Sequence, residues 1–472
     1  MSASAYFLIA LAVLPASPAT VFAADKPNVI VILCDNLGYG DLGCFNPRAY
    51  QPTPRIDRMA QQGIKFTHAY AAAPVCTPSR AALLTGCYPR RVGLDLAPGQ
   101  GPVLRPASAY GLHPDEITVA EVLKQQGYAT LCIGKWHLGD QPEFLPTRQG
   151  FDEYFGIPYS DDMTTNPKRN FPTLPLMEGE KVIAANDDLS LFTKHGTERA
   201  LQFIEQHSST PFFLYFPQVT PGSTVHPPVS PAFQGKSGRD AWSDSVMELD
   251  WSTGQIIDKL DALGLSENTL IIWTSDNGAP FAGKGIGSNL PLKGNGYSIE
   301  EGGMRMPFIA RWPGHIHAGT VSTELITHMD VLPTLAALSG GAKPADRIID
   351  GHDIRPLLFG EAGARSPYEA FFYYYVNQLQ AVRSGPWKLY LAGDKRLTQF
   401  GAKTAATLGR LYHLVEDPAE QNDQFAQHPD IVKRLLAYAE AARADLGDVD
   451  HAGKGVRPVG KVEHPTPRLL NP

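Results

Sequence analysis

The chain has 472 residues, of which 43% are hydrophobic and 19% are charged, a composition typical of a folded globular protein. Its formal net charge of -7 argues against a nucleic-acid-binding protein, because such proteins usually carry an excess of basic residues. The length allows about three domains, or one large α/β domain with a smaller one. A small anionic substrate stays possible, since a local cluster of cations can act against the overall charge.

The N-terminus has the pattern of an export signal. An apolar run at residues 6–14 is too short to span a bilayer, and small residues follow at 21–24. We predict that residues 1–24 are a signal peptide, with a short membrane anchor as the alternative. The chain contains no Asn-x-Ser/Thr sequon, so a periplasmic or secreted bacterial protein is the simpler expectation. Five cysteines, at positions 34, 44, 76, 87 and 132, define no disulfide framework.

Two β-branched runs, at residues 27–33 and 269–274, predict buried parallel strands. Each is followed by an Asp-Asn pair, Asp35-Asn36 and Asp276-Asn277. Pairs delivered at the carboxyl ends of strands match a ligand site in an open α/β sheet. Their oxygens suit a hard cation such as calcium or magnesium. Either pair alone is more typical of an ordinary turn.

Residues 76–86 predict a helix that begins near a cysteine. Thr77 is the expected cap, Pro78 suits the first turn, and Gly86 can end the helix. Cys76 would then lie at a helix N-terminus, where an anion is favoured, and Arg80 could reach the same anion one turn later. A lone cysteine at a helix start is more often a structural thiol.

This Cys-x-Pro-x-Arg run continues into Leu-Thr-Gly and is followed by Tyr-Pro-Arg-Arg-Val-Gly at residues 88–93. Together these motifs resemble the sulfatase family, in which the cysteine is oxidised to formylglycine (3-oxoalanine) by a separate maturation enzyme. The resemblance implies an alkaline-phosphatase-like α/β fold, with a large mixed sheet sandwiched by helices and a smaller C-terminal domain. It assigns the metal, Ca2+ or Mg2+, to Asp35, Asn36, Cys76, Asp276 and Asn277. The family usually has Asp where this chain has Asn36.

A Lys and a His follow the next predicted strand. A capping box at Thr118 to Glu121 opens a helix that closes near Gly127, and a strand follows at 129–133. On an extended backbone Lys135 and His137 point to the same side, as an anion clamp and a proton shuttle would. A Lys-x-His alone would more often lie in a solvated loop, but Gly-Lys-Trp-His-Leu-Gly closely resembles the family.

Four further segments complete the predicted site. Residues 151–162, which include Ser160, resemble the arylsulfatase A and N-acetylgalactosamine-6-sulfatase branch of the family. The irregular stretch 163–190 carries Lys168 and Arg169 and is expected at the surface, near the mouth of the site. Helices are expected at 197–207 and 247–263 and a strand at 211–216. His226 is followed by two prolines that fix the chain, and Lys293 lies in a Gly-rich loop before residues 300–307.

The pattern changes near residues 360–367. We predict a catalytic domain at 25–365 and a C-terminal domain at 366–472, with antiparallel strands at 370–376, 380–383, 387–391 and 411–414 and a helix at about 429–446. The tail after Gly447 is expected to be loosely packed.

The resemblance implies a sulfuric ester hydrolase that releases sulfate from a sulfated carbohydrate or an aryl sulfate. In this interpretation the metal and Arg80 hold the modified Cys76, while Lys135, Ser160 and Lys293 bind sulfate. His226 protonates the leaving group, and His137 assists collapse of the sulfated intermediate. The expected partners are a sulfated small molecule or glycan and the maturation enzyme, with neither nucleic acid nor stable membrane insertion.

Two other functions stay open. A phosphate or phosphonate monoester hydrolase of the same superfold would need further ligands for a second metal ion, and no convincing set is visible. A non-catalytic protein that binds sulfate esters would be consistent with Asn36 and with an unmodified Cys76.

Overall fold

The structure is a computed structural model that describes residues 26–165, 169–185, 188–393, 395–398, 401–403 and 408–470. The predicted signal peptide and Lys168 lie outside these ranges. Within them, no helix combines the length and the hydropathy needed to cross a bilayer.

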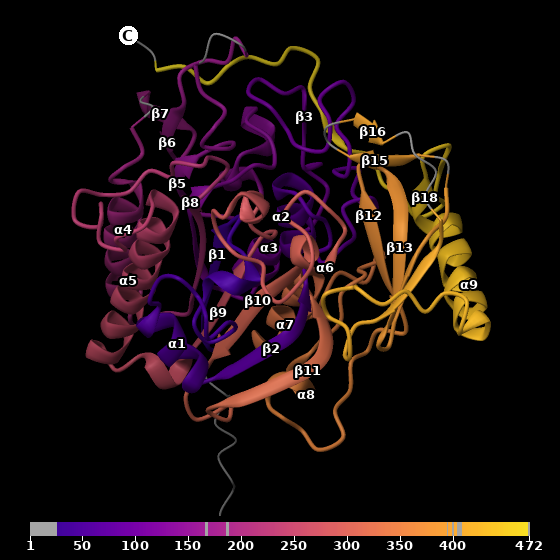
Figure 1. Cartoon of the computed structure of the whole chain (residues 1–472). Coiled ribbons are helices and arrows are strands. Elements are labelled where there is room, and N and C mark those ends of the chain that lie inside the picture. Colours follow the sequence, from indigo (N-terminus) through magenta and orange to yellow (C-terminus); the bar gives the residue numbers. More distant parts are fainter. Residues whose placement is uncertain are drawn as a thin grey trace, which may run out of the picture.

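A ten-stranded mixed sheet forms the centre of the molecule, in the order β11-β2-β10-β9-β1-β8-β4-β5-β6-β7 (Figure 1). Strand β1 is parallel to β8 and β9, and β4 is parallel to β8 and β5. All eight residues of β1 are buried, as expected for a central strand. The strands are β1 (Asn28–Asp35), β2 (Ile64–Tyr70), β4 (Ala129–Lys135), β5 (Glu153–Ile157), β6 (Pro175–Glu178), β7 (Lys181–Ala185), β8 (Phe212–Pro221), β9 (Thr269–Ser275), β10 (Arg305–Arg311) and β11 (Thr320–Thr327).

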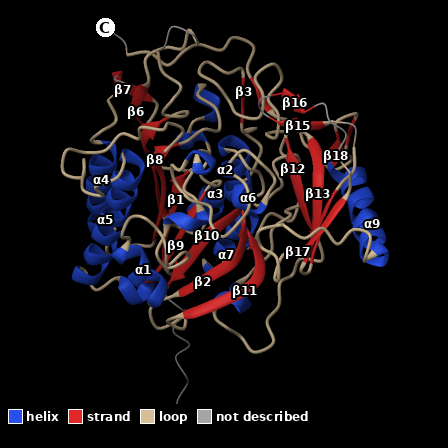
Figure 2. Ribbon diagram, viewed as in Figure 1, coloured by secondary structure: helices blue, strands red, loops and turns tan. Residues whose placement is uncertain are grey.

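Helices cover both faces of this sheet (Figure 2). Alternate residues of β1 enter two different cores: Val29 and Val31 pack with residues of α2, α3 and α7, whereas Ile30 and Ile32 pack with residues of α1, α4 and α5. The predicted mixed sheet between helices is therefore confirmed. The helices are α1 (Pro54–Gln61), α2 (Cys76–Thr85), α3 (Val119–Gln125), α4 (Phe192–Gln206), α5 (Ala241–Ala262), α6 (Glu301–Met304), α7 (Val331–Leu338), α8 (Arg355–Leu358) and α9 (Pro429–Leu446).

Helix starts depend on the capping residue. The predicted capping box at α3 is present, because Thr118 Oγ1 accepts from the Glu121 N–H while the Glu121 carboxylate accepts from the Thr118 N–H. Two predicted starts are wrong. Helix α5 begins at Ala241 and not at 247, since Asp240 caps it by accepting from Ser243 N at 2.8 Å. Helix α4 begins at Phe192 and not at 197.

The C-terminal part forms its own antiparallel sheet, in the order β12-β13-β14-β17, beside the main sheet (Figure 1). Helix α9 packs on β13, as predicted. The strands are β12 (Phe371–Tyr375), β13 (Gln378–Ser384), β14 (Trp387–Tyr390) and β17 (Arg410–His413), with the short pairs β15 (Arg396–Thr398) and β16 (Gly401–Lys403), and β18 (Gly447–Asp448) and β19 (His451–Ala452).

The expected loose tail after Gly447 is wrong. Strand β20 (Gly460–Lys461) pairs with β3 (Tyr110–Gly111) in the first quarter of the chain. The Arg457 guanidinium also binds the buried Glu116 carboxylate at 2.7 and 2.9 Å. The end of the chain therefore packs back onto the domain that carries the main sheet.

Candidate active site

The site forms where β1 and β9 end side by side. Cys34 of β1 lies opposite Ser275 of β9, so the next residues, Asp35 and Asp276, become neighbours at the carboxyl edge of the sheet. Both are fully buried, and the Asn36 N–H donates to Asp276 Oδ1 at 2.9 Å. The two Asp-Asn pairs, far apart in sequence, are thus brought together.

Helix α2 places Cys76 above these carboxylates. Cys76 is the first residue of the helix, and its Sγ lies 3.6 Å from Asp35 Oδ1 and 3.9 Å from Asn36 Oδ1. The predicted cap at Thr77 is wrong, because Thr77 lies inside the helix and its Oγ1 donates to the His137 carbonyl at 2.9 Å. Gly86 ends the helix as predicted, with a φ of 69°.

Arg80 lies one turn after Cys76 and connects both carboxylates. Its Nε and Nη2 donate to Asp276 Oδ2 at 3.0 and 2.7 Å, and Nη2 also reaches Asp35 Oδ1 at 3.1 Å. Burial lowers the pKa of Arg80, but Asp276 and Asp35 outweigh it and raise the pKa above its usual range. The guanidinium is therefore a permanent cation that fixes the geometry of the two strand ends.

Lys135, at the end of β4, binds the other side of Asp35. Its Nζ lies 2.9 Å from each Asp35 oxygen and 3.1 Å from Ser160 Oγ. Burial raises the pKa of Asp35 to about 7 although Lys135 opposes the shift. For Asp276, Arg80 and Lys135 outweigh burial and lower the pKa.

The oxygen atoms at this edge fit a divalent cation. Asp35, Cys76 and Asp276 place ligand atoms within 4.8 Å of one another. Asn277 Oδ1 is buried and accepts no hydrogen bond within the described part of the chain, and Asn36 Oδ1 lies 2.5 Å from Asn277 Nδ2. Carboxylate and amide oxygens are the donors that calcium and magnesium prefer.

His137 lies in the predicted site, but the backbone that carries it has a different conformation from the extended one predicted. Its φ is 62°, so the segment after β4 is not extended and the expected alternation of side chains does not apply. The ring Nε2 lies 2.9 Å from the Leu104 carbonyl, which makes Nε2 the protonated nitrogen. Burial, with Lys135 and Arg80, lowers the pKa of His137 well below its usual range. Nδ1 is consequently a buried acceptor with no hydrogen-bond partner among the described residues.

A cavity of about 690 Å³ opens over Cys76. Its wall includes His137, Ser160 and also Tyr297, a half-buried residue with a φ of 67° that no sequence motif singles out. The remaining lining residues are Gln100, Pro102, Val103, Arg105, Asp162, Met163, Arg169, Phe171, Ser223 and Phe281.

Two predicted site residues lie neither in this wall nor among the buried groups that contact Asp35, Cys76 and Asp276. Lys293 Nζ lies 3.2 Å from the Glu420 carbonyl and 3.9 Å from Glu300 Oε1, in the direction of the C-terminal domain. His226 is exposed in its loop. Their roles toward sulfate stay predictions.

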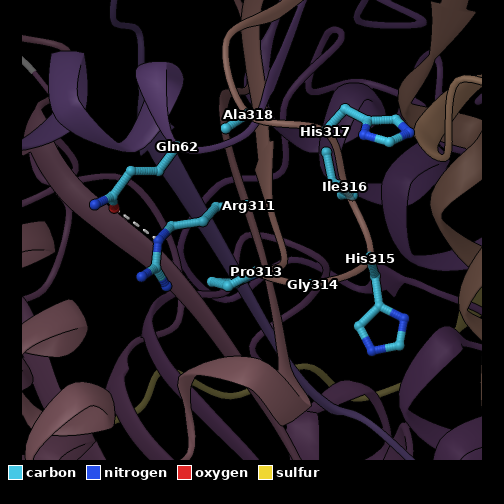
Figure 3. A pocket seen from close by; sticks show the side chains of 8 residues that line it. All are labelled: Gln62, Arg311, Pro313, Gly314, His315, Ile316, His317 and Ala318. Atoms are coloured by element: carbon cyan, nitrogen blue, oxygen red, sulfur yellow. Dashed lines mark hydrogen bonds between the residues drawn. The ribbon is translucent and has the colours of Figure 1, made fainter.

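A second cavity, of about 480 Å³, lies at the turn between β10 and β11 (Figure 3). Arg311 Nε donates to Gln62 Oε1 at 3.0 Å, and the rings of His315 and His317 point away from Arg311. His315 stacks on Trp312 with ring centroids 4.1 Å apart. Because these groups do not converge on a common point, this cavity is not a candidate active site.

The candidate nucleophile, Cys76, lies at a helix N-terminus beside a candidate cation site at the edge of a mixed sheet. Together with the alkaline-phosphatase-like fold, this arrangement is that of a hydrolase of anionic esters. A sequence model described as Sulfatase matches residues 27–341. A second, described as N-sulphoglucosamine sulphohydrolase, C-terminal, matches residues 297–443. The chain therefore belongs to the sulfatase family, the hydrolases of sulfuric esters.

Individual relatives agree. Arylsulfatase A of Homo sapiens is 39% identical, over 89% of this chain and 86% of the relative. N-acetylgalactosamine-6-sulfatase of Mus musculus is 40% identical, over 78% of this chain and 72% of the relative. The crystal structure of PsFucS1 sulfatase from Pseudoalteromonas sp. matches with a TM-score of 0.78 and 28% identity, over 89% of this chain and 90% of that one. The resemblance noted in the sequence is confirmed.

Proposed function

We propose that this sulfatase uses a formylglycine made from Cys76 to release inorganic sulfate from a sulfated carbohydrate or an aryl sulfate. The observation that carries the proposal is the position of Cys76, at the first turn of a buried helix and 3.6 Å from Asp35. The names of two relatives, one an arylsulfatase and one acting on a sulfated amino sugar, support the two substrate classes. Removal of residues 1–24 on export would place the enzyme in the periplasm or outside the cell.

Asp35, Asn36, Asp276 and Asn277 would hold a calcium ion, or magnesium, together with the oxidised side chain of residue 76. A bound ion would polarise the attacking oxygen and the sulfate group. The hydrated aldehyde would supply one hydroxyl whose attack on sulfur displaces the substrate alcohol. It would also supply a second hydroxyl whose deprotonation releases sulfate by cleavage of the C–O bond and restores the aldehyde.

The protein groups around residue 76 then have separate tasks. The N–H groups at the start of α2 favour negative charge there. Arg80 holds both carboxylates in place. Lys135, whose Nζ donates to Ser160 Oγ, would bind the sulfate group together with that hydroxyl. His137 Nδ1 has no hydrogen-bond partner in the described part of the chain and would take the proton from residue 76. His226 as the acid and Lys293 as a further sulfate contact would require their loops to move toward a bound substrate.

The alternative functions are less well supported. A phosphate or phosphonate monoester hydrolase with two metal ions needs a second ligand set, and among the described residues only one cluster of three His, Cys, Asp or Glu ligands forms. A non-catalytic protein that binds sulfate esters would not need, in the same cavity wall as Cys76, a histidine whose buried Nδ1 has no hydrogen-bond partner among the described residues.

The test is expression with a formylglycine-generating enzyme, followed by mass spectrometry of the peptide that contains Cys76. The same protein is assayed for sulfate release from an aryl sulfate and a panel of sulfated sugars, and for phosphate release from matched phosphate and phosphonate esters. We expect the aldehyde, sulfate release, and loss of activity in Cys76→Ala. An active preparation that contains only the thiol would contradict the formylglycine proposal. Preferential phosphate release would favour the esterase alternative, and tight binding without turnover would favour the binding protein.

A further inference from the structure

Two arginines lie in the wall of the active-site cavity. Arg105 and Arg169 are both exposed and both line the cavity over Cys76. Arg169 Nη1 is paired with Asp162 Oδ2 at 3.0 Å. For the Arg105 guanidinium, the described part of the chain supplies no ion pair or side-chain hydrogen bond. Arg105 is therefore a cation whose charge is available to a ligand in the cavity.

The backbone that carries Arg105 is tied to the helix that carries Cys76. The Leu104 N–H donates to Thr77 Oγ1 at 3.2 Å, and the Leu104 carbonyl accepts from His137 Nε2 at 2.9 Å. The Arg105 N–H donates to Gln100 Oε1 at 3.0 Å. The first two hydrogen bonds tie the residue next to Arg105 to Thr77 and His137, so the backbone from which the Arg105 side chain extends is fixed relative to Cys76.

Aromatic side chains line the space between these points. Phe171, Phe281 and Tyr297 are half-buried in the same wall, and Phe281 is fixed edge-on against Trp242 with centroids 6.4 Å apart. Flat apolar faces of this kind pack against the faces of sugar or aryl rings. A volume of about 690 Å³ is within the range of sites that enclose a whole organic ligand, and far more than one sulfate group requires.

We propose that Arg105, supported by Arg169, forms a second anion-binding subsite, and that the natural substrate is a sulfated sugar with a second anionic group near the ester that is cleaved. This inference rests on the proposed function. A sulfate or a carboxylate would suit, because a guanidinium binds the oxygens of either in a bidentate manner. Arg169 would add charge only if its pair with Asp162 opens. A substrate with one sulfate and an otherwise neutral ring would leave Arg105 without a partner.

The experiment compares three substrates on the matured enzyme: a sugar with one sulfate, the same sugar with a second sulfate, and the same sulfated sugar linked to a uronic acid. Each is measured with the wild type, Arg105→Gln and Arg105→Lys. We expect Arg105→Gln to lower kcat/KM about 10–100-fold on a substrate with two anionic groups, mainly through KM, as expected for loss of a charge-assisted hydrogen bond. The monosulfated sugar should change less than twofold. Arg105→Lys should keep part of the preference for substrates with two anionic groups. Whether Arg105→Gln loses more kcat/KM on the disulfated sugar or on the uronic acid conjugate shows whether the subsite binds sulfate or carboxylate.

The matched control is Arg365→Gln, an arginine whose side chain is 76% exposed and lies outside the cavity wall. Equal effects of Arg105→Gln on all three substrates, or no effect on any, would overturn the subsite. Failure of the proposed function looks different, because no substrate would then release sulfate although Cys76 is converted. In that case calorimetry of the same sugars with Cys76→Ala and with Cys76→Ala/Arg105→Gln decides on the subsite without turnover. Weaker binding of the sugars with two anionic groups to the double variant supports the subsite, and unchanged binding overturns it.

Discussion

Lys135 donates to both oxygens of the Asp35 carboxylate, with its Nζ 2.9 Å from each. This contact joins the ends of β4 and β1 and leaves Ser160 Oγ as the other neighbour of Nζ. The lysine predicted to bind sulfate is therefore also the cation that neutralises a predicted metal ligand. With both carboxylates ionised, Asp35, Asp276, Arg80 and Lys135 together carry no net charge, so a bound divalent ion would make the site positive.

Replacing Lys135 separates these two roles. We expect Lys135→Met to lower kcat/KM by roughly 10²–10³, the usual cost of losing one charge-stabilising donor. It should also lower the melting temperature in chelator, because the Asp35 charge loses a buried partner. Calcium should restore the melting temperature but not the activity. Thermal melts and sulfate-release kinetics with and without calcium test this. If the melting temperature and kcat/KM of Lys135→Met both equal those of the wild type, Lys135 has no role in the mechanism.

Lys293 gives a contrasting test, since its Nζ lies near the Glu420 carbonyl and outside the cavity wall. If its loop moves onto bound substrate, Lys293→Ala should also lose roughly 10²–10³ in kcat/KM. If the observed contact persists during turnover, the loss should stay below about threefold. The same sulfate-release assay distinguishes the two, with Lys284→Ala as a control for removal of one exposed charge.

Asn36→Asp should strengthen calcium binding, because the number of carboxylates is one determinant of calcium affinity. The present set offers two carboxylates, Asp35 and Asp276, beside the amide oxygens of Asn36 and Asn277. A less neutralised ion polarises the sulfate group more strongly, so we expect no matching gain in kcat. The measurement is a calcium titration of activity after chelation, in both proteins. Identical midpoints would show that residue 36 is not a ligand, and activity that ignores chelation would contradict the metal site.

Stability should depend on pH through Asp41, which lies outside the proposed metal ligands. Burial raises its pKa from 3.8 to about 7, against hydrogen bonds from Gly38 N and Trp242 Nε1. Between pH 3.8 and about 7 the folded protein therefore keeps the proton on the Asp41 carboxyl, whereas the unfolded chain loses it. The contribution of Asp41 to stability is complete below pH 3.8 and is lost as the pH rises through about 7.

The check is denaturant unfolding of the wild type and Asp41→Asn across this interval. Because the amide keeps an acceptor but carries no charge, the difference in unfolding free energy should shift in favour of the Asp41→Asn variant with rising pH and level off above about pH 8. A difference that is independent of pH would show that the Asp41 carboxyl has an ordinary pKa in the folded state.

The C-terminal tail should contribute to stability. Arg457→Met removes the guanidinium that binds the buried Glu116 carboxylate. The remaining cation near Glu116 is then Arg347, whose Nη1 lies 4.0 Å from the carboxylate. We expect a loss of about 1–3 kcal/mol, because a buried charged group loses its main donor. Arg365→Met, at an exposed position, is the matched control in the same unfolding assay. Equal stability of both variants would mean that the return of the tail is energetically unimportant.

Much of the fold could be predicted from local patterns. The apolar runs before Asp35 and Asp276 predicted two central strands, and parallel strands necessarily bring their carboxyl ends to one edge. The capping box at Thr118 was predicted because all of its partners lie within four residues. The pairing of β20 with Tyr110–Gly111 was missed because its partner is distant in sequence and carries no local signal.

Within the site, sequence patterns predicted which residue types gather but not how they connect. Arg80 was expected to face an anion, whereas it spans two carboxylates, an arrangement that depends on the register of β1 and β9. His137 and Tyr297 have positive φ values, which are uncommon for residues other than glycine, and the surrounding contacts impose them. Arg105 has no motif around it, and only the cavity shows its position.

All ten residues of α2 are buried, and Cys76 is 3% exposed. An oxidising enzyme that must hold the chain around Cys76 and Arg80 cannot grasp this segment once the helix has packed between the sheet and α7. Under the proposed function, oxidation of Cys76 would therefore have to precede folding of this segment. A molecule that folds first would remain in a thiol form that later exposure to the maturation enzyme would not convert. The active fraction of a preparation should then follow the ratio of maturation enzyme to newly made chain during synthesis, and unfolding and refolding in the presence of that enzyme should recover the rest.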